Sequence, residues 1–451
     1  NAAWAFSKVD LEGGSSEDVM DSKRSTFQSS INVCIDALGN ASIDRLSEFD
    51  ARGVCNLTCA LAKTAQQSSG GNIHASNLNT HTNALTALSN ETRTRVLSTK
   101  HEIFANDKDT TQFSARDIAA SSWAFATLEV NDESLFLALA ESSIEKIKNS
   151  EFDARGLANV AWAHAKTTIA ESEIRQNLFK HLSKALQKEC EKAKSASFYA
   201  TTSYESGGSG GNNSLTSRDV ANTAWAFAKA CCPDDELFAA LLQVTTIHGA
   251  LEKFNNQDLV NTAWAFAKLA VRESNLLLKA MRSTIKTRAE QDTLTATNIC
   301  TIVWAISSGG GGVGGTYKDN SGIIPQDFSF AEVTEALAYA AERASYESPA
   351  NQLAATAWTF ADGNIINQDL FKTLSKRVTL ILLNSGVNDQ DFFGDEELDN
   401  LEWAFSKAGN PGNVLKVIKS KKKEKGLGMV GDGKSNGFDP SGDPSLLNSS
   451  A

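Results

Sequence analysis

Apolar and polar residues alternate with a helical period along this chain, most clearly at 219–229 (DVANTAWAFAK). On a helical wheel with Trp225 at 0° and about 100° per residue, five other positions fall on one arc. They are the positions five, four and one before the tryptophan, and two and three after it. Those positions are apolar in this copy and in the others, and with the tryptophan they predict the buried face of an amphipathic helix. Many of them are alanines, which allow stacked helices to approach closely.

The same frame, here called the Trp motif, recurs along the sequence. The copy at 258–268 (DLVNTAWAFAK) is nearly identical, and all eight tryptophans occupy one column of the frame. Further copies are centred on Trp4, Cys59, Trp123, Trp162, Trp304, Trp358 and Trp403. Uninterrupted copies lie 39 or 40 residues apart, which exceeds the tetratricopeptide and ankyrin periods (about 34 and 33) and falls near the HEAT and armadillo range.

Capping signals mark the start of each Trp-motif helix. An N-cap residue stands nine positions before the tryptophan column in six copies: Asp50, Ser114, Asp153, Thr216, Asn255 and Thr295. The capping-box position three residues later holds Asp117, Asp219, Asp258, Gln352 or Glu397. Apolar residues just before the cap and four beyond it predict a hydrophobic staple. A second helix per repeat is expected to carry an apolar pair: Leu135-Phe136, Leu237-Phe238, Leu276-Leu277 or Leu370-Phe371.

These patterns predict an all-α fold, a right-handed α-solenoid of two-helix repeats of about 39 residues. We expect residues 1–409 to form about nine repeats, the first of them truncated. Gly/Ser-rich stretches at 13–30, 66–77, 200–214 and 307–322 are predicted to be surface loops inserted between helices. Residues 410–425 read as a basic helical segment, with a helix from 414 onward, and the composition of 426–451 predicts a disordered tail.

Composition limits the function in several ways. The net charge of −11 counts against a simple cationic nucleic-acid binder, although the total does not say where the charges lie. No run approaches the ~18 apolar residues of a membrane span, so membrane insertion is not expected. Seven cysteines without a C-x-x-C pair indicate reduced thiols in an intracellular compartment. Because the chain starts within a repeat and without Met, we expect a fragment that has lost any targeting segment.

A polar stripe runs beside the tryptophan column, at the positions seven before, three before and four after it. Its members are Arg52, Asn56, Lys63, Arg116, Arg155, Asn159, Lys166, Arg218, Asn222, Lys229, Gln257, Asn261, Lys268, Asn400 and Lys407. Lysine in a last helical turn is favoured by the helix dipole by ~0.3–1 kcal/mol, and asparagine can bond a neighbouring repeat. The arginines stand in the first turn, where the dipole disfavours a cation, so the stripe is predicted to face a ligand. The Trp304 and Trp358 copies depart from it, and Glu396 reverses the charge in the last copy.

The sequence NTAWAFAK, at 222–229 and 261–268 in a two-helix unit of about 39 residues, resembles the octotricopeptide repeat (OPR) proteins of algae and apicomplexans. It is also similar to the repeats of FAST-kinase-like proteins and of the RNA-editing substrate-binding complex of trypanosomatid mitochondria. The resemblance covers roughly 1–409 and implies a mitochondrial or plastid α-solenoid that binds single-stranded RNA in transcript processing, stability or translation. The RAP domain that many such proteins carry at the C-terminus is not recognisable.

Three functions remain open at this point. Successive repeats can present Arg and Lys to RNA phosphates and Asn to bases, alone or with protein partners in an RNA-processing complex. Alternatively, an armadillo/HEAT-like scaffold uses repeated Asn and Trp to clamp an extended peptide. An enzyme is the weakest reading, because the six histidines show no metal-ligand spacing and no phosphate-binding Gly-x-x-x-x-Gly-Lys loop exists. We therefore expect no cofactor and no small-molecule substrate, and we interpret His164 as a core substitution for the repeat's Phe.

Overall fold

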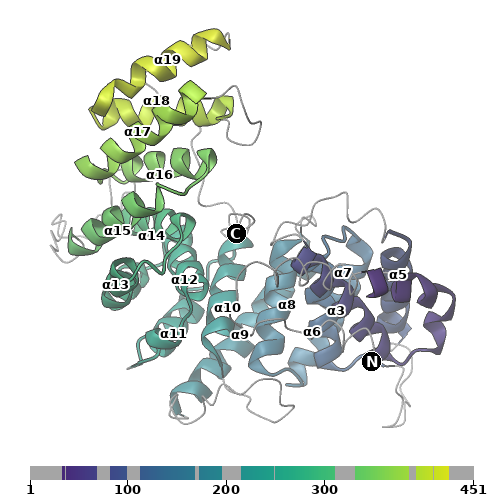
Figure 1. Cartoon of the computed structure of the whole chain (residues 1–451). Helices are drawn as coiled ribbons and strands as arrows, with labels where there is room; N and C mark the ends of the chain where they lie inside the picture. The colour runs from purple at the N-terminus through teal and green to yellow at the C-terminus, as the bar shows by residue number, and fades with distance from the viewer. Residues whose placement is uncertain are drawn as a thin grey trace, which may run out of the picture. The chain divides into compact units, whose positions relative to one another are not determined.

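The structure is a computed structural model, shown in Figure 1. It describes residues 33–35, 37–68, 82–98, 112–167, 172–195, 215–247, 249–309, 331–384, 393–409 and 411–425. These residues form helices and connections, with no strand among them, which confirms the all-α prediction. They fall into two compact units: unit 1 runs to Leu241 and unit 2 begins at Leu242, within α11 (Asp235–Thr245). The first Trp-motif copy at 1–8, the inserts at 13–30 and 200–214 and the tail at 426–451 lie outside the described residues.

Unit 1 consists of two rows of helices. The Trp-motif row contains α3 (Ala51–Ser68), α6 (Ala115–Thr127), α8 (Ala154–Lys166) and α10 (Ser217–Lys229), and each packs on the next. The second row contains α5 (Thr82–Ser98), α7 (Glu133–Lys148) and α9 (Glu173–Ser195), and the 3₁₀ helix η1 (Ile43–Glu48) packs on α5. The motif helices α3, α6 and α8 also contact the second-row helix that follows each of them in sequence.

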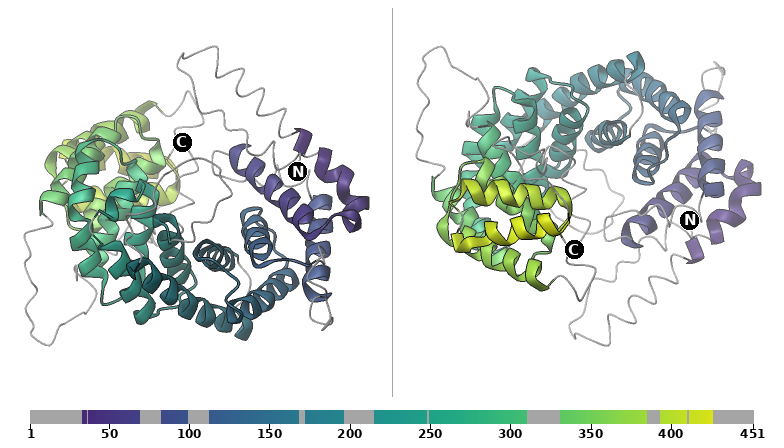
Figure 2. Two further views of the ribbon diagram at one scale, coloured as in Figure 1. Left: turned by 90° about the horizontal axis from the view of Figure 1, so that it is seen from below. Right: turned by 90° about the horizontal axis from the view of Figure 1, so that it is seen from above.

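Unit 2 repeats the two-row arrangement, and its helices can be followed by colour in Figure 2. Its motif row contains α12 (Asn256–Leu269), α14 (Ala296–Gly309), α16 (Ala350–Asp362) and α18 (Asp395–Lys407). Its second row contains α13 (Ser274–Glu290), α15 (Ala331–Ala344), α17 (Gln368–Asn384) and α19 (Val414–Glu424), and the unit includes the 3₁₀ helices η2 (Leu251–Lys253) and η4 (Pro411–Asn413). Because α3 runs to Ser68 and α14 to Gly309, the inserts predicted at 66–77 and 307–322 begin inside helices.

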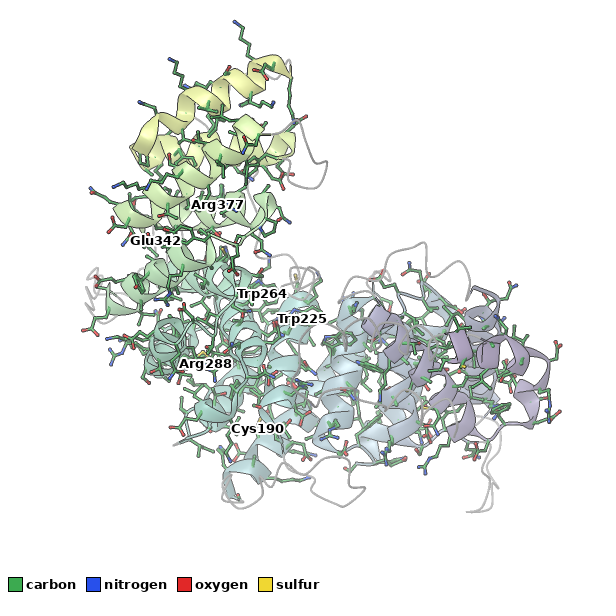
Figure 3. The ribbon with its side chains drawn as sticks, viewed as in Figure 1. Cys190, Trp225, Trp264, Arg288, Glu342 and Arg377 are labelled. Carbon is green, nitrogen blue, oxygen red and sulfur yellow. The ribbon has the colours of Figure 1, made fainter. Side chains whose placement is uncertain are left out.

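The predicted buried arc is the core of both units. In α12 its five members, Leu259, Val260, Ala263, Phe266 and Ala267, are all buried. The tryptophan column is less uniform than the sequence pattern predicts. Trp225, Trp264 and Trp358 are buried (the first two are labelled in Figure 3), whereas Trp123, Trp162, Trp304 and Trp403 are half-buried. The column therefore lies at the margin of the core, where one ring edge can reach the surface.

The predicted capping boxes form at two motif helices. The pairs Ser114 with Asp117 and Thr216 with Asp219 each exchange both hydrogen bonds. Thr295 forms a third box with Asn298, a partner that the sequence pattern did not indicate. The prediction for Gln352 is wrong, because the N-cap of α16 is Pro349, which has no backbone N–H to donate.

A different cap occurs where the N-cap residue is aspartate. The Gly53 N–H donates to Asp50 Oδ1 at 2.6 Å, and the Gly156 N–H donates to Asp153 Oδ1 at 2.7 Å. A Cβ at Gly156 would lie 2.8 Å from the Phe152 ring and 3.0 Å from the Asp153 carboxylate. The staple ring therefore occupies the space above the glycine, so an aspartate cap is combined with glycine at the box position.

The second-row helices bury the predicted apolar pairs, with one shift of register. Leu135-Phe136, Leu237-Phe238 and Leu370-Phe371 are buried. In α13 the buried residues are Leu277 and Leu278, and Leu276 is 58% exposed, so the predicted pair is displaced by one position. This displacement turns the pair by about 100° around the helix, which decides which side chain reaches the core.

The last helix is held by its lysines. Lys422 Nζ lies 2.5 Å from Glu402 and 2.7 Å from Asp399, both on α18, and the lysine is buried. Burial lowers the pKa of Lys422, but its hydrogen bonds to these two carboxylates outweigh that effect and raise the pKa overall. Lys425 donates to Asp395 and to the Phe393 carbonyl. The predicted helix from 414 is thus confirmed, and it packs on α17 and α18 at the end of unit 2.

Candidate nucleic-acid interface

The arginine column of the predicted stripe lies on unit 1, and we call its four members the arginine ridge. Arg52, Arg116, Arg155 and Arg218 stand in the first turns of α3, α6, α8 and α10, and all are exposed. These helices pack consecutively, and packed helix axes lie ~8–10 Å apart. One guanidinium is therefore available about every 10 Å along the row.

The lysine column contacts the half-buried tryptophans. Lys166 Nζ lies 5.3 Å from the ring centroid of Trp162, and Lys407 Nζ lies 5.2 Å from that of Trp403. Each of these tryptophans also contacts the tryptophan of a neighbouring motif helix, Trp225 in unit 1 and Trp358 in unit 2, at 6.1 Å between centroids. The cation–π contact holds the ammonium over the face of the half-buried ring. Lys63 and Lys229 are half-buried at the equivalent positions, and Lys268 is exposed.

The amide column is partly accessible. Asn56, Asn159 and Asn222 are half-buried on unit 1, as are Gln257 and Asn261 on unit 2. The last pair is internally satisfied, because Gln257 Nε2 donates to Asn261 Oδ1 at 2.6 Å. Asn400 is buried, at 4% exposure, so its predicted place on the ligand-facing stripe is wrong. The side chains left to face a ligand are the three asparagines of unit 1.

The ridge arginines have a structural neighbour that the sequence did not reveal. Arg52 Nε lies 3.9 Å from Asp117 Oδ1, the box residue of the next motif helix. Burial raises the pKa of Asp219, and the hydrogen bonds of Thr216 and the charge of Arg155 oppose that rise. Arg52 and Arg155 thus face the capping acid of the following repeat, which offsets the unfavourable dipole of their own helices.

This neighbour does not bury the arginines. The Arg52 side chain is 64% exposed, so its ion pair contributes on the order of 0–1 kcal/mol. Arg95 shows what a structural arginine looks like in this fold: its side chain is 11% exposed and donates to the Phe49 and Leu46 carbonyls. Arg288 makes the equivalent bond to the Phe254 carbonyl in unit 2. The ridge side chains remain open to solvent, which is the condition for binding a ligand.

Among the described residues, the arginine column is confined to unit 1. The corresponding positions of unit 2 carry Gln257, buried Thr297, exposed Asn351 and exposed Glu396. Glu396 lies in a first turn with two further acids, where a negative charge is favoured. A polyanion therefore meets an arginine at this position on each described motif helix of unit 1 and on none of unit 2, where Lys268 and Lys407 are the stripe's cations.

His164 has a core role, as the sequence indicated. It is buried, its ring packs edge-on against Phe136 at 5.5 Å, and it replaces the phenylalanine that most other copies have at this position. Burial, with a smaller effect from the charge of Arg175, lowers the pKa of His164 to about 3. The imidazole is therefore neutral at physiological pH and is not available as a ligand-binding cation.

No protein-family model matches this chain, and no curated protein matches it. Among the described residues, no group of three or more His, Cys, Asp and Glu side chains is placed to hold a metal ion. None of the described helices has the length and apolar character that crossing a membrane requires.

Proposed function

We propose that this chain is an RNA-binding helical-repeat protein, a right-handed α-solenoid of two-helix repeats of about 39 residues whose arginine ridge binds the backbone of single-stranded RNA. The observation that carries the proposal is an exposed arginine at one position of four consecutively packed motif helices. Guanidinium groups bind phosphate oxygens in a bidentate manner, and a regular row of them suits a regular polyanion. The net charge of −11 is no obstacle, since binding depends on local potential.

A single strand fits the ridge better than a duplex. Half-buried Asn56, Asn159 and Asn222 stand beside the arginines, where an amide can pair with the edge of an unstacked base. In an A-form duplex the Watson–Crick edges are paired, and the major-groove edges lie in a deep, narrow groove that side chains do not enter. On the resemblance to organellar repeat proteins, we further propose that the chain acts in transcript processing, stability or translation in a mitochondrion or plastid.

The test measures binding of labelled single-stranded RNA to the whole chain by fluorescence anisotropy, with a duplex of the same sequence as competitor. Affinity should fall with salt by about 0.7 log units per neutralised phosphate and per log unit of salt, and the duplex should compete poorly. Absent binding, or binding that salt does not change, would overturn the proposal. Nuclease-treated pull-downs decide the alternative, because a peptide-clamping scaffold keeps its partners after the RNA is digested.

A further inference from the structure

A basic groove lies in unit 1 near Arg116, the second member of the arginine ridge, between α7, the turn into α8, and α9. Its cavity of about 210 Å³ is lined by Lys148 at the end of α7, Lys184, Lys188 and Lys192 on α9, and Phe152 in the turn. We call it the α7–α9 groove. Glu189 is its acidic lining residue, and this carboxylate already binds Lys192 at 2.6 Å.

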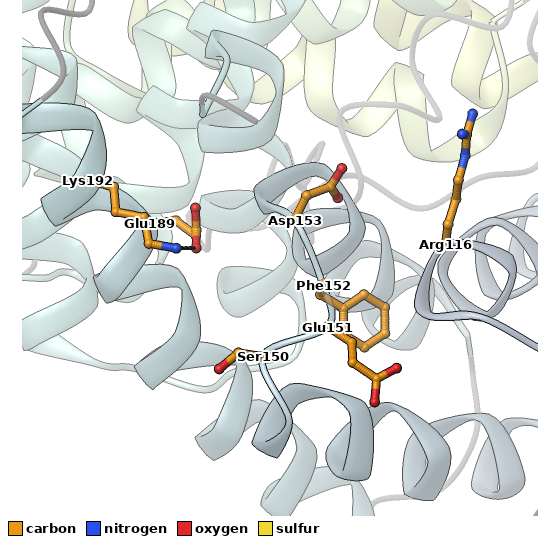
Figure 4. Close-up of a pocket in the computed structure, with 7 residues that line it drawn as sticks. All are labelled: Arg116, Ser150, Glu151, Phe152, Asp153, Glu189 and Lys192. Carbon is orange, nitrogen blue, oxygen red and sulfur yellow. Dashed lines mark hydrogen bonds and ion pairs between the residues drawn. The ribbon is translucent and has the colours of Figure 1, made fainter. Parts of the chain in front are cut away.

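The groove is continuous with the ridge. A neighbouring cavity of about 370 Å³ shares Phe152, Glu189 and Lys192 with the α7–α9 groove and is also lined by Arg116 and Asp153 (Figure 4). Arg116 is a member of the arginine ridge, so this second cavity has a ridge cation of α6 and Lys192 of α9 in its lining, together with the carboxylates Glu151 and Asp153 of the turn into α8. A chain of phosphates bound at Arg116 would reach the lysines of α9 without leaving the surface of unit 1.

Three lysines of the groove lack an acidic partner. Lys148, Lys184 and Lys188 are exposed, and within the described part of the chain none of them forms an ion pair with a carboxylate. Neighbouring lysines do, since Lys146 pairs with Glu151 at 3.1 Å and Lys194 with Glu191 at 2.6 Å. The uncompensated positive charge is therefore concentrated where the cavity lies.

The arrangement on α9 is unfavourable for the helix itself. Lys180, Lys184, Lys188 and Lys192 follow one another at intervals of four residues, which puts like charges on adjacent turns. Each such pair destabilises a helix by roughly 0.2–0.5 kcal/mol. The helix dipole explains Lys148 in a last turn, but Lys184 and Lys188 lie in the middle of α9. Within the described part of the chain no carboxylate compensates these two lysines, and a bound anion would do so.

We propose that the α7–α9 groove binds the phosphodiester backbone of the same RNA strand as the arginine ridge, with Arg116 joining the two surfaces. This inference rests on the proposed function. Phe152 forms the apolar floor but is only 9% exposed, so it offers no stacking platform for a base. The groove therefore recognises charge without sequence preference and extends the bound strand beyond the ridge.

The test replaces Lys148, Lys184 and Lys188 by Gln and compares the triple variant with a matched control, Lys372→Gln, Lys376→Gln and Lys416→Gln in unit 2. Each control lysine is exposed and also has no ion pair among the described residues. The groove variant should reduce the salt slope of RNA binding by about 2, corresponding to three phosphates at ~0.7 each. Its melting temperature should stay the same or rise, because repulsion on α9 is relieved.

The outcomes distinguish RNA binding by the α7–α9 groove from RNA binding by the arginine ridge. If the wild-type chain binds RNA and the groove variant keeps its affinity and salt slope, the groove inference is wrong while the ridge proposal stands. If the control triple lowers the slope equally, the contribution is general surface charge and the inference is also wrong. If the wild-type chain binds no RNA, the proposed function itself fails. A shorter RNA length for full affinity in the groove variant supports an extended binding path.

Discussion

Replacing the arginine ridge by glutamine gives the sharpest test of its role. The variant carries Arg52→Gln, Arg116→Gln, Arg155→Gln and Arg218→Gln, which remove four positive charges from unit 1. Glutamine has a helix propensity close to that of arginine, so the helices themselves are little affected. The variant thus changes charge at four exposed positions and leaves the core intact.

The expected change in binding follows from the number of phosphates released. Four contacts at ~0.7 each lower the salt slope by about 2.8. Between about 50 and 200 mM salt, which is ~0.6 log units, the wild-type affinity should therefore fall roughly fiftyfold more than that of the variant. Stability should change little, because the exposed Arg52–Asp117 pair contributes about 0–1 kcal/mol and removal of a first-turn cation gains ~0.3–1 kcal/mol.

The assay combines anisotropy at four salt concentrations with a thermal melt of each protein. The control replaces four exposed cations of unit 2, Lys279, Arg282, Lys372 and Lys376, and should keep the wild-type slope. An equal loss in the control would show that binding is spread over all surface charge, which refutes the ridge. A large drop in melting temperature with unchanged affinity would assign the arginines to the contact with the next repeat's capping acid.

Three further predictions concern the scaffold. His164 has a pKa of about 3 when folded and about 6.5 when unfolded, so its contribution to stability is complete above pH ~6.5 and is lost as the pH falls. At pH ~5 the free energy of unfolding of unit 1 should therefore be lower by about 2 kcal/mol. His164→Phe should abolish this loss, as urea titrations at the two pH values can show. Lys422→Met should cost about 3 kcal/mol, because the buried Glu402 then keeps only the more distant Lys419, at 3.8 Å, and adding Glu402→Met should restore most of the loss, as hydrogen exchange of α18 and α19 can show. Thr216→Val removes a capping hydroxyl and should lower the unfolding free energy by about 1 kcal/mol. Thr223→Val in the same helix should be neutral or stabilising, because that buried hydroxyl has no hydrogen-bond partner among the described residues.

Helix positions could be predicted well because their signals are local. The cap, the box and the staple of α10 lie within nine residues, so Thr216, Asp219 and Val220 define its start without any tertiary information. The error at Gln352 is also local in origin, since Pro349 at the cap removes the donor that a box requires. The 3.6-residue period likewise places the buried arc, because the helix has one face against its neighbours.

Contacts between repeats could not be predicted in the same way. Arg52 contacts Asp117, which lies 65 residues later in the sequence. A cation in a first helical turn is unexplained by its own helix, and the contact that accounts for it is made by the next motif helix. Asn400 shares its column with accessible asparagines, but in the last motif helix that position is buried. The lysines of α9 could not be predicted as a site, because they lie outside the Trp motif and the groove forms only where α7, the turn into α8 and α9 come together.

The distribution of charge reconciles an acidic chain with a polyanionic ligand. The lysines of α19 form the most basic run in the sequence, yet Lys419 and Lys422 face Glu402, and Lys425 faces Asp395. These cations neutralise carboxylates of α18 and hold α19 against that helix, so they are engaged in packing. Unit 1 instead leaves the arginine ridge and the groove lysines in solvent. Substitution of Lys422 should therefore change stability and leave RNA affinity unchanged, the opposite of what the arginine ridge should show.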